Sequence, residues 1–312
     1  MARHITLVVA EARAAGPDIR RLVLRDPDGW PLPKIKPGAH VDLDVPGIGL
    51  RAYSLMGDPA VADRWVVAVK REAASRGGSA WLHDGLAEGD TIAAAMPRCT
   101  FPLADAARHV MIAGGIGVTP FLAMAPVLAR NDADWVLHVL HRGPLPCPGD
   151  LAPWIESGRA VAHDTRAAPR PSLAALLGAH APGTHAYACG PQAMLDAFTE
   201  ATAAWPDGTA TIEHFIPPAL PPDPTARPYT LVRASTGATV EVQAGGSMAA
   251  ALLSIGGSVE LSCEGGICGA CKIRWIEGEP VHRDRVLSAA ERATHVMACV
   301  AGCASDRLVV DA

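Results

Sequence analysis

The alternation of apolar and polar positions divides the chain into three parts, and the first part consists of short strands. Turns rich in glycine and proline separate its apolar stretches, and one helix is expected at 79–86. The predicted strands are 4–13, 20–25, 40–45, 51–56, 65–71 and 91–96. Short strands without a long helix between them are typical of an antiparallel barrel. We therefore predict a β-barrel domain over residues 1–104.

Strands and helices alternate in the second part, from about residue 105. One strand leads through a glycine turn into a helix that begins at Pro120, and another helix is expected over 191–204. The predicted strands are 109–113, 135–140, 184–188 and 209–215. Such alternation is typical of a doubly wound parallel sheet, which we predict for residues 105–216.

A proline-rich stretch, residues 217–228, precedes the third part and suits neither a helix nor a central strand. We expect it to form a semi-extended linker. Beyond it the pattern predicts a hairpin over 229–243 and a helix over 248–255 that begins after Ser247. Residues 229–312 are therefore expected to form a third, small domain.

Four cysteines in this third part have the spacing of a plant-type 2Fe–2S ferredoxin, C-x4-C-x2-C with a distant fourth. They are Cys263, Cys268, Cys271 and Cys299. A structural zinc site would instead show paired C-x2-C repeats. Three glycines in the loop allow positive φ and leave no Cβ in the way, so backbone N–H groups can point at the sulfurs. These are Gly265, Gly266 and Gly269. The alternative is a group of buried core thiols.

Composition limits the classes of protein that the chain can be. Its 312 residues, 49% of them apolar, allow two or three packed domains, and a net charge of −5 argues against a nucleic-acid platform. No apolar run has the length of a membrane span, and the first residues lack the pattern of a signal peptide. Eight cysteines in a chain of this length do not indicate a disulfide scaffold, so we expect a cytoplasmic protein.

A glycine-rich turn after the strand at 109–113 is a candidate phosphate site. Its sequence is G-G-I-G-V-T-P, and the candidate residues are Gly114, Gly115, Gly117, Thr119 and Pro120. Thr119 suits the N-cap of the next helix and Pro120 its first position, so the helix N-terminus would attract a pyrophosphate. The spacing differs from the Rossmann G-x-G-x-x-G, and the turn can also be a simple connection.

Three other stretches are candidates for binding. On the strand Arg51-Ala52-Tyr53-Ser54, alternation places Arg51 and Tyr53 on one face and Ser54 on the other. A helix opened by Arg76, Gly77, Gly78 and Ser79 is a second possible phosphate site. Cys189, Gly190 and Pro191 follow a strand, where open parallel sheets bind ligands. A surface arginine beside a half-buried tyrosine, and a packed thiol, are the alternatives.

Taken together, these residues resemble the phthalate dioxygenase reductase and vanillate demethylase reductase family over essentially the whole chain. The resemblance implies an antiparallel flavin-binding β-barrel, a nucleotide domain and a C-terminal plant-type ferredoxin of the β-grasp fold. It implies that Arg51, Gly78 and Ser79, with Arg76 nearby, hold the FMN phosphate, that Tyr53 contacts the flavin, and that Ser54 lies near its N5.

The same resemblance assigns the nucleotide side. Residues 114–120 match the nicotinamide-nucleotide loop, Cys189, Gly190 and Pro191 border the nicotinamide, and Phe215, in E-H-F, lies against the flavin. Ser54 and Cys189 would be the catalytic residues. The chain departs from the family where V-A-G-C follows the fourth cysteine instead of V-S-R, which leaves Cys303 without a role.

The function implied is that of a reductase component. NADH would reduce FMN, FMN would pass electrons to the 2Fe–2S cluster, and the cluster would pass them to a Rieske-type oxygenase that hydroxylates or demethylates an aromatic or similar small substrate. We also expect the chain to be a monomer. NADPH stays open, because the strand at 135–140 is followed by His141-Arg142 and no acidic residue. The alternatives are a reductase for a cytochrome P450 or a di-iron oxygenase, a stand-alone flavin or quinone reductase, and a redox sensor.

Overall fold

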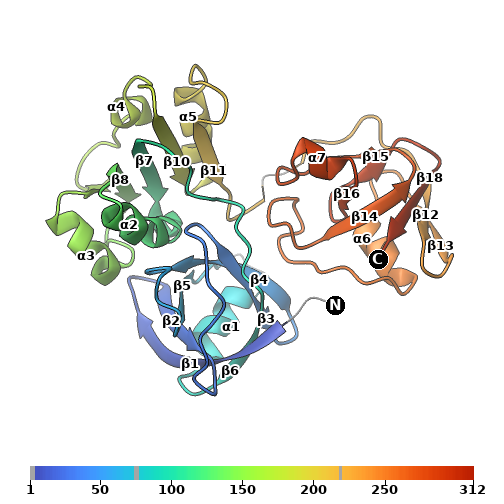
Figure 1. Ribbon diagram of the computed structural model, residues 1–312, viewed down its shortest axis with the longest axis horizontal. Helices are drawn as coiled ribbons and strands as arrows, with labels where there is room; N and C mark the ends of the chain where they lie inside the picture. Colours follow the sequence, from blue (N-terminus) through green and yellow to red (C-terminus); the bar gives the residue numbers. More distant parts are fainter. Residues whose placement is uncertain (1–3, 74–76, 218–219) are drawn as a thin grey trace. The chain divides into compact units, whose positions relative to one another are not determined.

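The computed structural model describes residues 4–73, 77–217 and 220–312, which form two compact units (Figure 1). One unit ends at Phe215 and the other begins at Ile216. Arg76, a predicted phosphate ligand, lies outside the described residues. Within the described residues no helix has the length and apolar character needed to cross a membrane.

The first unit begins with a closed barrel of antiparallel strands in the order β1-β2-β5-β4-β3-β6. The strands are β1 His4–Ala14, β2 Ile19–Arg25, β3 His40–Val45, β4 Gly49–Met56, β5 Trp65–Lys70 and β6 Thr91–Ala95, with helix α1 at Gly78–Asp84. Alternate side chains such as Leu22, Leu43 and Val67 are fully buried in the barrel core. All the predicted strands and the predicted helix are confirmed here, with ends that differ by a few residues.

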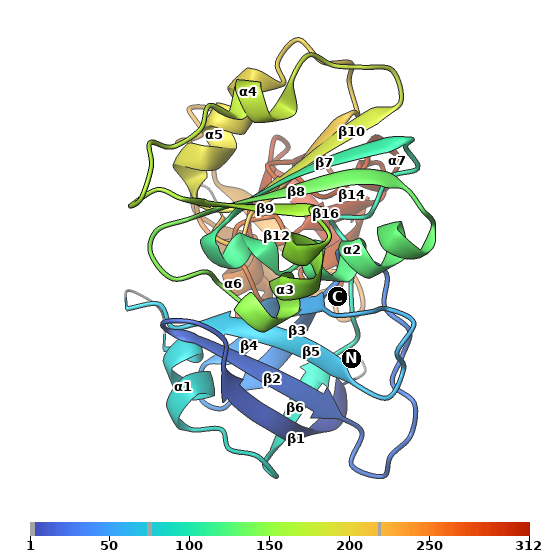
Figure 2. The same cartoon turned by 90° about the vertical axis from the view of Figure 1, so that its left-hand side faces the viewer.

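A parallel sheet of order β11-β10-β7-β8-β9 follows in the same unit (Figure 2). Its strands are β7 Arg108–Gly114, β8 Asp134–His141, β9 Ala160–Asp164, β10 Thr184–Cys189 and β11 Ala210–Glu213. The helices are α2 Phe121–Arg130, α3 Pro148–Glu156, α4 Leu173–Leu177 and α5 Gln192–Ala201, with a 3₁₀ turn η1 at Gly115–Val118. Since side chains alternate along a strand, Met111 packs with α2 and α3 while Val110 packs with α4 and α5. The doubly wound prediction is confirmed.

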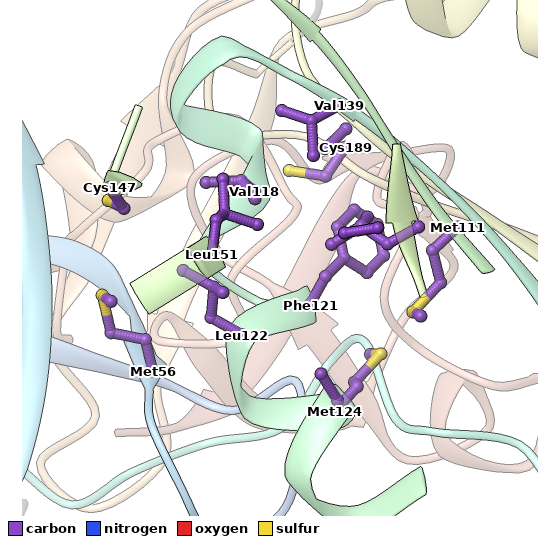
Figure 3. Close-up of a cluster of buried hydrophobic side chains, with 14 of the residues drawn as sticks. Met56, Met111, Val118, Phe121, Leu122, Met124, Val139, Cys147, Leu151 and Cys189 are labelled. Atoms are coloured by element: carbon purple, nitrogen blue, oxygen red, sulfur yellow. The ribbon is translucent and has the colours of Figure 1, made fainter. Parts of the chain in front are cut away.

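One buried cluster joins the barrel to the sheet. Met56 of β4 lies in this cluster with Leu122 of α2 and Leu151 of α3, and Cys189 at the end of β10 belongs to it as well (Figure 3). The order of the sheet changes direction at β7 and β10, which is where open parallel sheets bind ligands. The barrel and this edge of the sheet are therefore parts of one packed body.

The second unit contains a mixed sheet of order β13-β12-β18-β14-β16 with helix α6 packed on it. Its elements are β12 Tyr229–Arg233, β13 Thr239–Val242, α6 Met248–Ser254, β14 Lys272–Glu277, β15 Pro280–Val281, α7 Ala289–Arg292, β16 His295–Met297, β17 Gly302–Cys303 and β18 Arg307–Asp311. Ser247 is the N-cap of α6, since its Oγ accepts the Ala250 N–H at 3.3 Å. The arrangement confirms the predicted β-grasp fold.

Candidate functional site

The four cysteines of the predicted cluster site come together in two pairs. Cys263 and Cys268, in the loop after α6, are within hydrogen-bonding reach of each other, and so are Cys271 and Cys299. The Gly265 N–H donates to Cys263 Sγ at 3.4 Å, and the Cys299 N–H donates to Cys271 Sγ at 3.5 Å. Three of these thiols come from one loop and the fourth from the segment between β16 and β17.

This donor set fits a two-iron cluster. Among the described residues, no group of three or more His, Cys, Asp or Glu side chains could hold a single metal ion. Two pairs of thiols match a cluster of two irons bound by four cysteines. The Cys268 thiol donates to Cys263 and lowers the pKa of Cys263 to about 5, which favours the thiolate that a metal requires. The same contact raises the pKa of Cys268.

The glycines of this loop have different roles. Gly266 and Gly269 have φ of +70° and +80°, as predicted. Gly265 does not use positive φ, but a Cβ there would lie 1.9 Å from Pro217 Cβ, which confirms that this position has no room for a Cβ. Glu264, with φ of +56°, takes the left-handed conformation instead. Gly265 is therefore required by a close neighbour rather than by its own backbone angles.

The barrel brings the predicted flavin residues of β4 and α1 together. A Cβ on Gly78 would lie 2.9 Å from Arg51 Cγ, so the Arg51 side chain packs directly on the start of α1. Ser79 is buried, and its Oγ accepts the Glu72 N–H at 3.1 Å. Tyr53 packs against the barrel core, and burial raises its pKa to about 12 although Arg51 opposes this. A cation, an aromatic ring and a glycine-based helix start are thus adjacent.

Ser54 has the feature expected of a ligand-binding hydroxyl. It is 7% exposed, and its Oγ has no hydrogen-bond partner within the described part of the chain. Buried polar groups normally have such partners. Ser54 shares a face of β4 with Met56, which lies in the cluster between barrel and sheet. The residues present therefore fit a polar ligand held against β4 on the side of the sheet.

The loops after β7 and β10 touch through their backbones. A Cβ on Gly117 would lie 2.2 Å from the Cys189 carbonyl oxygen, and one on Gly190 would lie 2.9 Å from Gly114 Cα. These glycines permit the close approach of the two loops. Gly115 differs, because it has φ of +56° and no atom within 4 Å of its Cβ position. The space on the Cβ side of Gly115 is thus open among the described residues.

The prediction that Thr119 is the N-cap of the following helix is wrong. Its Oγ1 donates to the Ile116 carbonyl at 3.1 Å, and the N-cap of α2 is Pro120, without a side-chain cap. The 3₁₀ turn η1 between strand and helix displaces the helix start by one residue.

The buried Cys189 and the half-buried Glu213 form a pair at the carboxyl edge of the sheet. They are partners in the register of β10 and β11, and the Cys189 thiol is hydrogen-bonded to the Glu213 carboxyl. Burial raises the pKa of Glu213 to about 8 and that of Cys189 well above its usual value. Both groups are therefore predominantly neutral at pH 7. Sequence reasoning gave Glu213 no role, although its position at a strand end was a usable signal. Phe215, two residues further on, is 40% exposed.

Asp164 is an acidic residue beside the end of β8 to which the sequence analysis gave no role. It ends β9, pairs in register with His141, and accepts the Gly143 N–H at 2.9 Å. Backbone N–H groups, that of Arg166 first, lower the pKa of Asp164, so the carboxylate is charged. A cavity of about 240 Å³ is lined by Asp164, Thr165 and neighbouring residues up to Pro171. β9 was missed because its short A-V-A-H-D sequence has little apolar pattern.

Comparison with known proteins agrees with this arrangement. The family model described as "2Fe-2S iron-sulfur cluster binding domain" matches residues 232–303. The chain is 34% identical to phthalate dioxygenase reductase of Burkholderia cepacia, with 98% of this chain and 97% of that protein covered. The structure of a phthalate dioxygenase reductase, described as modular for electron transfer from pyridine nucleotides to [2Fe-2S], aligns with a TM-score of 0.73 over 99% of this chain and 98% of that chain, at 34% identity.

A larger protein contains a similar module. An intact type IV self-sufficient cytochrome P450 monooxygenase aligns with a TM-score of 0.89 at 36% identity, and the match covers 99% of this chain but 41% of that chain. The predicted family, the predicted fold class and the predicted class of enzyme are confirmed. The chain belongs to the phthalate dioxygenase reductase family, the iron–sulfur flavoprotein oxidoreductases that supply electrons to a terminal oxygenase.

Proposed function

We propose that the chain oxidises NADH with FMN as its flavin and passes the electrons through its 2Fe–2S cluster to a Rieske-type oxygenase acting on an aromatic or similar small substrate. The observation that carries this is the pairing of four thiols in two pairs, because such a cluster accepts one electron at a time. FMN, when bound, supplies the conversion of a two-electron hydride into single electrons.

The barrel residues would hold the flavin. Arg51, with Gly78 and Ser79 at the start of α1, would bind its phosphate by charge and backbone N–H groups. Tyr53 would pack along the ring or its ribityl chain. The unpartnered Ser54 hydroxyl would hydrogen-bond to the reacting edge of the ring.

The carboxyl edge of the sheet would hold the nucleotide. The open backbone at Gly115 would receive the pyrophosphate, beside the start of α2. Cys189 and Glu213 keep their protons at pH 7, so the nicotinamide would contact two uncharged side chains. These contacts would orient the ring for hydride transfer. Phe215, exposed at the end of this unit, would cover the flavin.

Asp164 favours NADH over NADPH. A charged carboxylate at the end of β9 would accept a hydrogen bond from a ribose hydroxyl and repel a 2′-phosphate. Asp164→Asn keeps the oxygen that Gly143 N–H requires and removes the charge. We expect the ratio of kcat/KM for NADH to that for NADPH to fall about tenfold, or about 1.4 kcal/mol. An unchanged ratio would place the ribose elsewhere.

Anaerobic mixing with NADH tests the overall proposal. We expect the flavin absorbance to bleach first and the iron–sulfur absorbance to follow in the same protein. Bleaching of the flavin with a permanently oxidised cluster would contradict it and would favour a stand-alone flavin or quinone reductase.

A heme oxygenase is the second candidate partner, because the same module occurs in a self-sufficient cytochrome P450. NADH consumption that depends on substrate, measured with a purified Rieske-type oxygenase and then with a cytochrome P450, separates the two. We also propose that the chain acts as a monomer in the cytoplasm. All eight of its cysteines lie in the described residues and are free thiols, which suits a reducing compartment.

A further inference from the structure

The described residues near the start of the second unit, Pro217 and 220–227, contact the rest of that unit; we call them the strap. Its first anchor is Pro217, which occupies the space where Gly265 would carry a side chain, 1.9 Å from that Cβ position. Gly265 in turn donates its N–H to Cys263 Sγ at 3.4 Å. The strap therefore begins directly on the loop that holds the cluster.

Further anchors follow along the strap. Leu220 packs against the core of the second unit, and the Arg283 guanidinium donates to the Pro221 carbonyl. At the other end, Arg227 donates to the Ala304 carbonyl at 2.9 Å and pairs with the Asp306 carboxylate. The stretch predicted as a semi-extended linker is thus fixed at both of its ends to the second unit.

Ile216 remains as the joint between the units. It is 76% exposed, the first unit ends at Phe215, and the strap begins at Pro217. The Cα atoms of Phe215 and Pro217 are two residues apart in the chain, so they are separated by at most about 7.6 Å whatever angle the joint adopts. Phe215 lies two residues after Glu213, and Glu213 lies at the sheet edge to which we assign the nicotinamide.

We propose that the strap is a docked part of the iron–sulfur domain, and that the length of the Ile216 joint controls the rate at which electrons pass from flavin to cluster. This inference rests on the proposed function. Once a linker spans the two sites that it joins, effective concentration falls as roughly the −3/2 power of its free length. Lengthening a one-residue joint by four residues then slows transfer about tenfold, whereas lengthening a free linker of a dozen residues slows it about 1.5-fold.

Two insertions of Gly-Ser-Gly-Ser test this in the full-length holoenzyme. One is placed between Ile216 and Pro217, ahead of the first anchor. The matched control is placed between Pro222 and Asp223, inside the strap, with the anchors at Pro221 and Arg227 on either side. Stopped-flow mixing with NADH measures flavin reduction and cluster reduction separately in each protein.

We expect the first insertion to slow cluster reduction about tenfold and the second to leave it within about twofold, with flavin reduction unchanged in both. Equal effects of the two insertions, or none from the first, would overturn the proposal. If NADH fails to reduce the flavin in the unmodified protein, the proposed function fails instead.

Two measurements independent of turnover complete the test. The electron paramagnetic resonance spectrum of the reduced cluster should be the same in all three proteins, which shows that the insertion has not damaged the cluster. In the unmodified protein, hydrogen exchange at the Thr225 and Ala226 N–H groups, which donate to Asp223 within the strap, should be slower than in an unstructured chain. Exchange at the unstructured rate would mean that the strap is undocked and would overturn the proposal.

Discussion

Replacing Gly117 by alanine should separate the two loops at the nucleotide edge. The added Cβ would lie 2.2 Å from the Cys189 carbonyl oxygen and 2.5 Å from the carbonyl carbon. Ordinary contacts of this kind begin near 3.4 Å. The backbone must therefore shift by about 1 Å, because no flexible side-chain end is available to move aside.

A shift of that size has two expected costs. Overpacking of a rigid contact destabilises by about 1–3 kcal/mol, which lowers Tm by roughly 2–4 °C for each kcal/mol in a unit of this size. A misplacement of about 1 Å at a reacting centre costs about 100-fold in rate. Since the loops carry the open backbone at Gly115 and the Cys189–Glu213 pair, both costs should appear together.

Ferricyanide reduction by NADH is the appropriate assay, because it follows the flavin and does not require the cluster. Gly149→Ala in α3 is the control, since no atom lies within 4 Å of its Cβ position and its φ is not positive. We expect kcat/KM for NADH to fall about 100-fold in Gly117→Ala and to stay unchanged in the control. A Gly117→Ala protein with normal kcat/KM would refute the assignment of this edge to the nucleotide.

Three further predictions concern single side chains. Cys268→Ser should abolish the iron–sulfur absorbance. Cys303→Ser should retain it, because Cys303 is buried and its Sγ lies 3.2 Å from the Ser305 carbonyl. Ser54→Ala removes a buried hydroxyl without a partner in the described chain, so calorimetry should find the flavin-free protein as stable as before or about 1 kcal/mol more stable. The same substitution should slow flavin reduction at least about tenfold. A variant that loses both stability and the rate of flavin reduction would make Ser54 a structural residue. Burial lowers the pKa of His138 from 6.5 to about 4, so the unfolded chain takes up the proton first and stability is lost as pH falls from 6.5 toward 4. The free energy of unfolding measured in urea should be lower by about 2 kcal/mol at pH 5 because of this protonation, and His138→Gln should remove that pH-dependent loss.

The fold could be predicted because its signals are local and periodic. The alternation of apolar and polar residues in β3, and the apolar runs of β5 and β7, follow directly from which faces are buried. β9 escaped detection because an edge strand of five residues with histidine and aspartate at its end carries no such signal.

The candidate sites were predictable where one segment supplies the chemistry, and less so where two segments meet. The cysteine spacing and the G-G-I-G turn are visible in the sequence. The use of Gly265 depends on Pro217, some fifty residues earlier, and no local rule predicts that contact. Thr119 failed as an N-cap because a 3₁₀ turn precedes the helix, and such turns have no sequence signature of their own. Asp164 depended on recognising β9 first.

The closed core shared by barrel and sheet has a consequence for damage by oxygen. Among the described residues, those buried in that core all belong to the first unit, and the iron–sulfur unit has an apolar cluster of its own. Loss of iron should therefore leave the barrel and the nucleotide sheet folded and still able to accept electrons from NADH. A molecule without its cluster, but with flavin bound, would then oxidise NADH only by passing the electrons to oxygen, and none would reach the oxygenase.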